Sequence, residues 1–332
     1  MLNAFVEWRD NMKEWLELYA ISKEGYVWSW VNDAKPGFHY PEIAGYMLSL
    51  FADAGYRPDL ARLVAHRLYR DLALNGGGVG RDGVVYLFDT AMALAGILAH
   101  LCREPQRQFT SSVAQSLALV KDLLRQRRCS LPKTNMPLPH RWSTVYGPHI
   151  LKVSYALVRA HRHLSDTEAL TLIQQLISDI MPLYRNGRFL AFPELEDCNL
   201  HANCYALEGL LICRESGSIA DAAANCYLLE GTDWLTEVQE ANGAIPEWHN
   251  GRRAWGAYRA DVTAQAVRLW LVIDRKRYAR EIERGLMFLS SLRTSEGGLR
   301  FDPLSLDVNT WATIFAIQAL DLLMDSNQVQ LV

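Results

Sequence analysis

The chain has 332 residues, half of them hydrophobic, which is enough to build a large buried core. Its 34 basic and 37 acidic residues give a net charge of −3 at pH 7, and this balance argues against nucleic acid or an anionic membrane surface as a partner. No apolar run approaches the roughly 20 residues of a membrane span, so we expect no transmembrane segment.

The first twenty residues form an amphipathic pattern with early acidic residues. A secretion signal would instead begin with basic residues followed by an apolar stretch. We therefore expect a cytoplasmic protein, in which cysteines are reduced, and most of the six lie within apolar helical patterns that predict burial. They are Cys102, Cys129, Cys198, Cys204, Cys213 and Cys226.

Two kinds of helical segment alternate along the chain. The first kind carries charges on one face and apolar residues at i, i+3 and i+4 on the other, which is typical of a helix with one solvent face. We expect such helices over residues 3–20, 57–75, 107–128, 166–184, 219–240 and 276–293. The second kind is almost free of charge after its first turn, which is typical of a helix buried on most sides. These segments open at Pro41, Asp89, His149, His201, Asp261 and Asn309.

The apolar segments recur every 47 to 60 residues, which is the spacing of a repeat architecture. Six charged and six apolar helices in alternation predict an all-α fold in which six outer helices surround six inner ones. We therefore expect one (α/α)6 toroid domain over residues 1–332. Short β-hairpins are expected in the loops at one rim, at residues 79–88, 188–194, 243–249 and 297–301. The long irregular stretch 129–146 is a further candidate for a functional loop.

One polar residue stands near the start of each inner segment. These residues are Glu42, Asp89, His149, His201, Asp261 and Asn309. In a sixfold ring, opposite units face each other, which predicts the pairs Glu42 with His201, Asp89 with Asp261, and His149 with Asn309. The ring makes Asp89, Asp261, His149, His201 and Glu42 the catalytic candidates.

The pair Asp89 and Asp261 is the most suggestive of chemistry. Two carboxylates across a gap of sugar size can act as general acid and general base, provided that one keeps its proton. Glu194, Asp197 and Glu247 are alternative acids in the preceding loops. The competing interpretation is structural, because Asp and Asn at a helix start often cap free N–H groups. Both interpretations remain open for Asp89, Asp261 and Asn309.

Aromatic residues are frequent in the loops before the inner segments, where they could stack on a sugar ring or stabilise a carbocation. The same residues could simply cover the core, since Trp and Tyr bury an apolar body and leave a polar tip in water. Lys152 is a further candidate, because a lysine inside an apolar helix needs a partner. Together with Arg252, Arg253 and Arg259, it could bind an anionic group. The predicted substrate-binding residues are His39, Tyr40, Tyr86, Tyr146, Lys152, Tyr205, Glu247, Trp248, Trp255, Tyr258, Asn309 and Trp311.

Cys198, His201 and Cys204 form a C-x2-H-x2-C pattern that could contribute to a zinc site. Three ligands so close on one helix rarely complete a tetrahedron without a fourth from elsewhere, and His149 is the ring residue that could provide it. We therefore predict no metal and no cofactor.

The segments HANCYALEGLL, YRADVTAQAVRLWL and DVNTWATIFAIQAL resemble toroid proteins of polysaccharide biosynthesis and glycoside-hydrolase type, including uronyl hydrolases and sugar epimerases. The turns QEANGAIPEW and SEGGLRF more weakly resemble the repeats of terpene cyclases and prenyltransferase β-subunits. The first resemblance implies a saccharide or glycoconjugate substrate in a central cleft and a hydrolase, lyase or epimerase activity. The second implies an isoprenoid cyclase, although the motifs D-x-D-D and D-D-x-x-D are absent. A third possibility is a non-catalytic saccharide-binding protein of a biosynthetic assembly.

Overall fold

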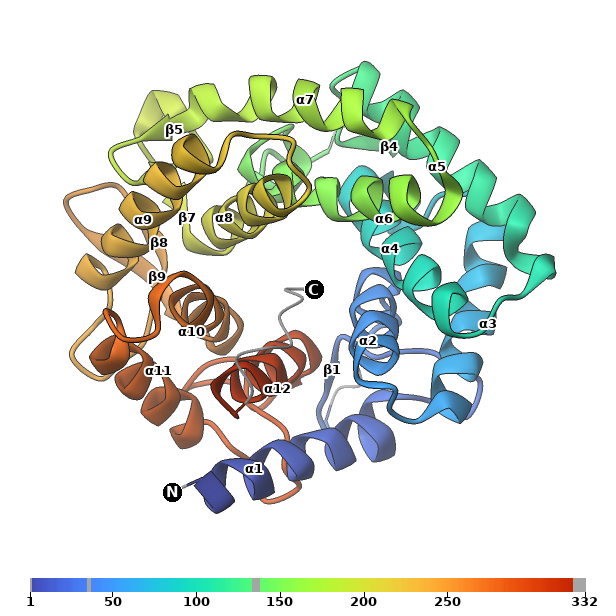
Figure 1. Cartoon of the computed structure of the whole chain (residues 1–332). Coiled ribbons are helices and arrows are strands. Elements are labelled where there is room, and N and C mark those ends of the chain that lie inside the picture. The colour runs from blue at the N-terminus through green and yellow to red at the C-terminus, as the bar shows by residue number, and fades with distance from the viewer. Residues whose placement is uncertain (1, 35–36, 133–137, 325–332) are drawn as a thin grey trace.

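Two concentric rings of helices form the molecule, and alternate helices along the chain belong to the outer and the inner ring (Figure 1). The computed structural model describes residues 2–34, 37–132 and 138–324. The outer helices are α1 (Leu2–Trp15), α3 (Pro58–Leu74), α5 (Thr110–Arg125), α7 (Glu168–Ile180), α9 (Asp221–Glu237) and α11 (Ala279–Ser291). The inner helices are α2 (Pro41–Ala54), α4 (Leu87–Arg103), α6 (Ser154–Leu164), α8 (Leu200–Glu215), α10 (Ala260–Asp274) and α12 (Thr310–Met324). This arrangement confirms the predicted (α/α)6 toroid.

The exposure of the two sets explains their positions. Every residue of α4 from Leu87 to His100 is buried, whereas α11 buries only a stripe that includes Ile282, Leu286 and Leu289. An apolar helix can be buried on all sides only when other helices surround it, and an amphipathic helix covers it while facing water. Some helices are extended by a turn of different geometry, and two of these lie in the first outer and the third inner unit. Outer helix α1 continues as a π-helical turn, Leu16–Ala20, and inner helix α6 is preceded by a 3-10 helix, η4 (Pro148–Val153).

Strand pairing closes the ring between the first and the last unit. Strand β1 (Trp30–Val31) pairs antiparallel with β10 (Val308–Asn309), with Trp30 opposite Asn309. The hydroxyl of Thr310, the first residue of α12, donates a hydrogen bond to the carbonyl of Trp28 at 2.6 Å. Helix α12 therefore packs beside α2 although the two are the last and first inner helices of the chain.

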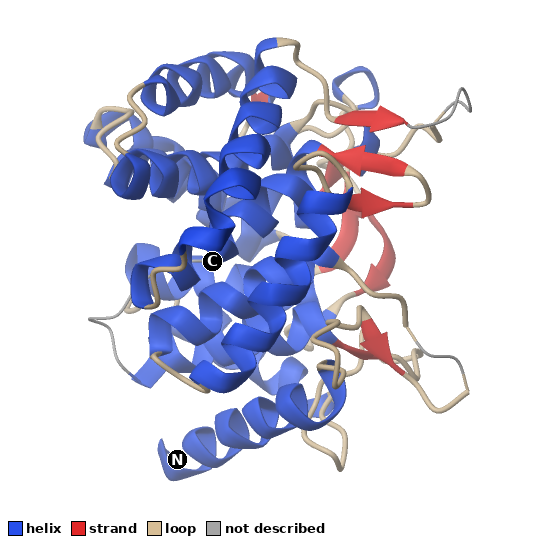
Figure 2. Ribbon diagram, turned by 90° about the vertical axis from the view of Figure 1, so that its right-hand side faces the viewer, coloured by secondary structure: helices blue, strands red, loops and turns tan. Residues whose placement is uncertain are grey.

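The remaining strands lie on one side of the toroid, in loops that lead into inner helices (Figure 2). The expected hairpins at 79–88 and 243–249 are confirmed as β2–β3 and β8, but each belongs to a sheet of three strands. Residues 297–301 make only isolated bridges, and residues 188–194 pair with an upstream strand that the sequence analysis did not predict. The bounds are β2 (Gly80–Arg81), β3 (Val84–Tyr86), β4 (Ser130–Pro132), β5 (Tyr184–Arg185), β6 (Arg188–Phe189), β7 (Cys198–Asn199), β8 (Pro246–His249) and β9 (Ala254–Tyr258).

Four of the six cysteines are buried, as expected. Cys102 and Cys226 are exposed instead, near the ends or outer faces of their helices. Within the described ranges, no helix is both long and apolar enough to cross a membrane.

The inner ring depends on close backbone contact between α2 and α4. A Cβ added at Gly96 would lie 2.3 Å from the carbonyl oxygen of Gly45, and one at Gly45 would lie 2.2 Å from the carbonyl oxygen of Met92. Both distances are far below van der Waals contact, so this crossing accepts only glycine.

We expect Gly96→Ala to destabilise the protein by about 1–3 kcal/mol, because overpacking outweighs the roughly 1 kcal/mol by which Ala is the better helix former. Thermal unfolding followed by circular dichroism measures the effect. The matched control is Gly147→Ala, whose Cβ would lie 3.5 Å from its nearest neighbour. Equal melting temperatures for the two variants would show that the crossing can relax.

Candidate functional site

A cavity of about 550 Å³ lies where the inner helices begin, on the side that carries the strands. Three groups of residues line it: helix starts, the strands before them, and the loop at 140–143. The full set is Trp30, Tyr40, Glu42, Arg81, Tyr86, Phe88, Asp89, His140, Arg141, Trp142, Ser143, His149, Phe192, His201, Tyr205, Glu247, Trp248, Arg259, Asp261, Phe301, Asp307, Asn309 and Trp311. All six residues of the predicted polar ring are among them.

The structure defines which helix positions form the ring more precisely than the pattern of polar residues in the sequence did. The second residue of every inner helical segment lines the cavity, counting η4 as the start of the third segment. These residues are Glu42, Phe88, His149, His201, Asp261 and Trp311. Asp89 is the third residue of α4, and Asn309 directly precedes α12, so these two do not occupy equivalent positions. Both residues still line the cavity, because positions next to the second residue of a helix also lie at its N-terminal end, where the cavity is.

Hydrogen bonds decide the capping question for two of the three residues left open, Asn309 and Asp89. Asn309 is a cap, since its Oδ1 accepts from the N–H of Ala312 at 2.9 Å. Asn199 has the same role for α8, with an accepted bond from the N–H of Ala202 at 3.1 Å. Asp89 makes no such bond, and its Oδ2 is buried without a hydrogen-bond partner among the described residues. Capping therefore does not explain Asp89.

Five predicted substrate-binding residues lie outside the cavity lining, each for a physical reason. His39 points to α3, where its Nε2 lies 2.7 Å from Asp71 Oδ2. The hydroxyl of Tyr146 faces Asp179 on α7 at 3.5 Å. The exposed Tyr258 donates to Glu240 at the outer face of β9. The other two residues are Lys152 and Trp255.

Lys152 lies one layer deeper than the cavity and is fully buried. It forms an ion pair with Glu208, which also pairs with Arg268, and all three side chains are inaccessible to solvent. Burial, opposed by Glu208, lowers the pKa of Lys152 to about 8. Its Nζ lies 4.8 Å from the ring centroid of Tyr205, which separates it from the cavity. The prediction of a partner was correct, but the partner is protein rather than substrate.

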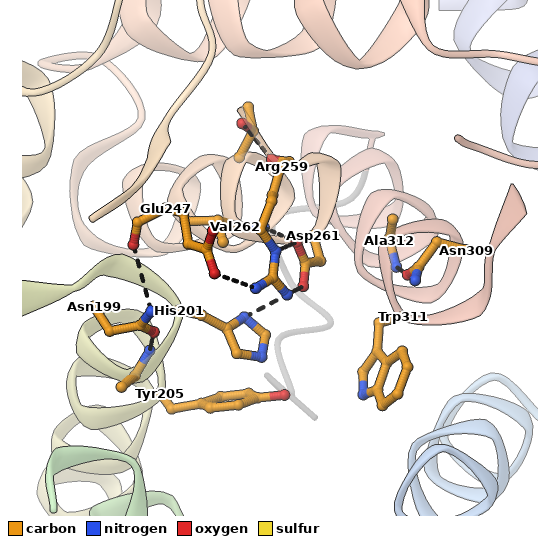
Figure 3. Close-up of polar contacts among 12 residues, drawn as sticks. Asn199, His201, Tyr205, Glu247, Arg259, Asp261, Val262, Asn309, Trp311 and Ala312 are labelled. Carbon is orange, nitrogen blue, oxygen red and sulfur yellow. Dashed lines mark hydrogen bonds and ion pairs between the residues drawn. The ribbon is translucent and has the colours of Figure 1, made fainter. Parts of the chain in front are cut away.

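One half of the cavity is organised around Arg259, the residue before α10. Its Nε donates to Asp261 Oδ1 at 3.0 Å, its Nη2 donates to Oδ2, and its Nη1 lies 3.4 Å from Glu247 Oε1 (Figure 3). The N–H of Val262 also donates to Asp261 at 2.9 Å. Burial would raise the pKa of Asp261, but the charge and hydrogen bonds of Arg259, together with His201 and the N–H of Val262, outweigh it and hold that pKa below its usual value. Asp261 is therefore a fixed anion.

His201 adjoins this ion pair, and His149 lies in the neighbouring unit. His201 Nδ1 is 3.5 Å from Asp261 Oδ2, at the outer limit of a hydrogen bond, so the contact is mainly electrostatic. The ring of Trp142 contacts both imidazoles, at centroid distances of 5.3 and 5.5 Å. Burial lowers the pKa of His201 to about 4 and that of His149 to about 3. Both imidazoles are thus neutral at pH 7 and can accept a proton.

The other half of the cavity holds two buried carboxyl groups. Burial, reinforced by the neighbouring Glu42, raises the pKa of Asp89 well above its usual value. Burial also raises the pKa of Glu42, although hydrogen bonds from Trp311 and Tyr40 oppose the shift. The hydroxyl of Tyr40 donates to Asp89 at 3.2 Å. Because two like charges here repel each other, Asp89 keeps a proton at a pH where an exposed aspartate is ionised.

The sequence analysis missed several residues of this site. Arg81 reaches it from the β2–β3 hairpin, with its guanidinium 5.0 Å from the ring centroid of Tyr40. Its position in a loop before an inner helix was the available signal, since most lining residues share that location. Trp30, Phe88 and Trp142 belong to the loop aromatics noted in the sequence, and the other lining residues without a predicted role are His140, Arg141, Ser143, Phe192, Phe301 and Asp307.

The C-x2-H-x2-C pattern does not assemble a metal site. His201 lines the cavity, but Cys198 and Cys204 are buried and absent from its lining, and burial raises the pKa of both thiols. No cluster of three or more His, Cys, Asp or Glu side chains suited to a metal ion occurs within residues 2–34, 37–132 and 138–324.

Comparison with known proteins supports the fold. No protein-family profile matches the sequence, and no curated protein matches it significantly. Among solved structures, the cellobiose 2-epimerase of Bacillus thermoamylovorans has a TM-score of 0.73 and 10% identity, covering 97% of this chain and 100% of its own. An unsaturated glucuronyl hydrolase specific for heparin has a TM-score of 0.70 and 10% identity, with coverages of 99% and 98%. A family 88 glycosyl hydrolase of Bacteroides vulgatus has a TM-score of 0.68 and 10% identity, with coverages of 98% and 99%. At this identity, the likeness establishes the toroid architecture.

We expect the two buried histidines to destabilise the folded protein as the pH falls below about 6.5, against the opposite contribution of Asp89 and Glu42, whose raised pKa values stabilise it on acidification. Each buried histidine has a folded-state pKa below its unfolded value, so its contribution is complete above pH 6.5 and is lost on acidification. The slope is up to about 1.4 kcal/mol per pH unit for each group. Urea unfolding at several pH values should show a shallower slope for His149→Gln than for wild type, with His66→Gln, on an exposed face of α3, as control. Equal slopes for all three proteins would contradict the assignment.

We further expect Arg259→Gln to raise the pH at which the His201–Asp261 pair takes up a proton. Removal of the guanidinium leaves the Asp261 charge to act on His201 alone, which should shift its pKa upward from about 4 by about one unit or more. Titration of the imidazole nitrogens by NMR measures this shift. Arg253→Gln, at the exposed turn of the β8–β9 hairpin, is the control. An unchanged His201 titration would mean that Arg259 does not govern the pair.

Proposed function

We propose that the protein is an enzyme that binds a saccharide in this cavity and transforms it by proton transfer. The observation that carries the proposal is the division of the cavity into two halves. One half holds the buried carboxyl of Asp89, whose pKa is raised, and the other holds the buried imidazoles of His149 and His201, whose pKa values are lowered. A proton donor and a proton acceptor in one enclosed site are the minimum equipment for general acid–base catalysis.

The chemistry of the lining supports a sugar as the ligand. The buried Trp30 Nε1, Asp89 Oδ2 and His149 Nδ1 have no hydrogen-bond partner among the described residues. Buried polar groups normally find partners, and sugar hydroxyls can both donate and accept. Aromatic rings complete the wall, and a volume of about 550 Å³ suits a ligand of one or two sugar rings. An isoprenoid would leave these polar groups unpaired, which disfavours the cyclase alternative.

Among carbohydrate reactions, the charges favour epimerisation or elimination over hydrolysis. Hydrolysis as predicted from the sequence needs Asp89 and Asp261 as a working pair. Both oxygens of Asp261 are engaged by Arg259, so this carboxylate is better placed to hold His201 than to attack a substrate. The epimerase and the uronyl hydrolase with the same fold show that such a toroid can accommodate epimerisation as well as hydrolysis.

The proposed step is a balanced proton exchange. One imidazole accepts the proton of a carbon next to the sugar carbonyl, while Asp89 donates its proton to the carbonyl oxygen, which gives an enediol. The reverse transfers restore the carbonyl, the Asp89 proton and the neutral imidazole. For inversion, the first imidazolium releases this proton to water and the second histidine takes one up from water. Its delivery to the other face inverts the carbon and leaves both imidazoles neutral. Burial beside Glu42 favours the protonated donor, and burial favours the neutral acceptor, whereas the Asp261 charge stabilises the imidazolium that forms at His201.

Incubation with free aldoses, cellobiose and unsaturated uronyl disaccharides in D2O, followed by proton NMR, tests this function. We expect deuterium at the carbon next to the carbonyl, and a loss of at least about 100-fold in kcat/KM for Asp89→Asn and for His201→Gln. Their melting temperatures should stay within a few degrees of wild type. Tyr258→Phe, outside the cavity, is the control.

Cleavage without deuterium on carbon would replace the proposed reaction by hydrolysis. Saccharide binding without any turnover would favour a binding protein, and full activity in both variants would reject the assigned roles.

A further inference from the structure

Three aromatic side chains continue the cavity wall towards the outside of the molecule. Phe192 and Trp248 line the cavity, whereas Trp255 lies beyond it on β9. The rings of Phe192 and Trp248 are 5.9 Å apart between centroids and 11° from parallel. Those of Trp248 and Trp255 are 6.0 Å apart and 8° from parallel. All three side chains are half-buried, so parts of their rings face solvent.

The spacing implies that the rings are stepped rather than fully stacked. Parallel rings in contact lie about 3.5–4 Å apart, so centroids separated by 6.0 Å are displaced sideways by roughly 4.5–5 Å. Trp248 and Trp255 then leave parts of their faces uncovered, whereas the imidazole of His140 also stacks on Phe192, at a centroid distance of 4.9 Å and an interplanar angle of 29°. The partly uncovered ring faces therefore form a series of apolar surfaces that leads out of the cavity.

The β8–β9 hairpin holds two of the three rings firmly. Trp248 and Trp255 are directly paired across the strands. Gly256, with φ of 84°, lets β9 approach β8 closely, because a Cβ there would lie 2.8 Å from Glu247 Oε2 and 3.3 Å from Trp248 Cδ1. The guanidinium of Arg253 lies 5.8 Å from the ring centroid of Trp255 and adds hydrogen-bond donors beside it.

Hairpin stability alone does not account for this arrangement. A cross-strand aromatic pair stabilises a hairpin by roughly 0.2–1 kcal/mol, which would explain Trp248 and Trp255. It would not explain why Phe192, from the separate loop before β7, lies parallel to them. Exposed aromatic faces that run on from a binding cavity are typical of an extended ligand site.

We propose that Phe192, Trp248 and Trp255 form an aromatic track that binds sugar units beyond the one in the cavity. The ligand is then an oligosaccharide or the end of a glycan chain rather than a monosaccharide. This inference rests on the proposed saccharide function and deepens it, since the cavity holds the reacting unit and the track holds the units linked to it. Trp255, which the cavity itself does not use, thereby gains a role.

Isothermal titration of wild type, Trp255→Ala and Tyr258→Ala tests the track without requiring turnover. The probes are two ladders of one to four sugar units, β-1,4-linked glucose and α-1,6-linked mannose. For the ladder that binds, we expect wild-type affinity to rise about tenfold or more from the monosaccharide to the trisaccharide. Trp255→Ala should lose this gain and keep the monosaccharide affinity. Tyr258→Ala, on the same strand but outside the track, should behave as wild type.

The variant Trp255→Phe keeps an aromatic face and should retain most of the gain, which separates lost stacking from a disturbed hairpin. Wild-type affinity that does not depend on length would overturn the track, as would an equal loss at every length in Trp255→Ala. Absence of binding by every member of both ladders would reject the saccharide function together with the track, whereas binding of short and long probes alike would reject the track alone.

Discussion

The convergence of inner-helix starts on one cavity is the constraint on which the site depends. The second residue of each inner segment faces the same hollow, so side chains far apart in sequence share one enclosed space. Helix N-termini carry partial positive charge, which favours anions such as Glu42 and Asp261 and disfavours imidazolium. This effect is worth about 0.3–1 kcal/mol at each terminus, less than one pKa unit. Burial and direct partners therefore decide which carboxyl keeps its proton.

A layer of buried charge supports the cavity from below. Lys152, Glu208 and Arg268 are fully buried and linked by ion pairs, and Arg268 also donates to Gln318. Such a network gains little net stability over apolar packing, but loss of one member leaves an uncompensated charge and is costly. It fixes the register of η4, α8, α10 and α12, which in turn fixes His149, His201, Asp261 and Trp311 at the cavity.

The helices were predictable because the spacing of apolar residues in each segment indicates whether the helix is buried on all sides or on one face only. The all-apolar segment after Asp89 becomes α4, buried almost throughout, and the striped segment 276–293 becomes α11 on the outside. The short strands were harder to predict, because two- or three-residue strands such as β1 and β10 have no periodicity to detect. They form because ring closure brings residues near 30 and 309 together. The loop residues Arg81 and Phe192 were missed for the same reason, since only the folded rim places them at the cavity.

Local hydrophobic patterning and repeat length predict the alternation of helices, the toroid and the six polar residues near the helix starts. The charge states and contacts of those residues arise from packing between distant parts of the chain. Asp261 is held as an anion because Arg259 folds back onto it, and the pKa of Asp89 is raised because its carboxyl is buried beside Glu42 of the neighbouring helix. Lys152 does not line the cavity because it pairs with Glu208, which is 56 positions later in the sequence. Charge states depend on burial and on distances across the ring, and neither quantity is written in the local order of residues.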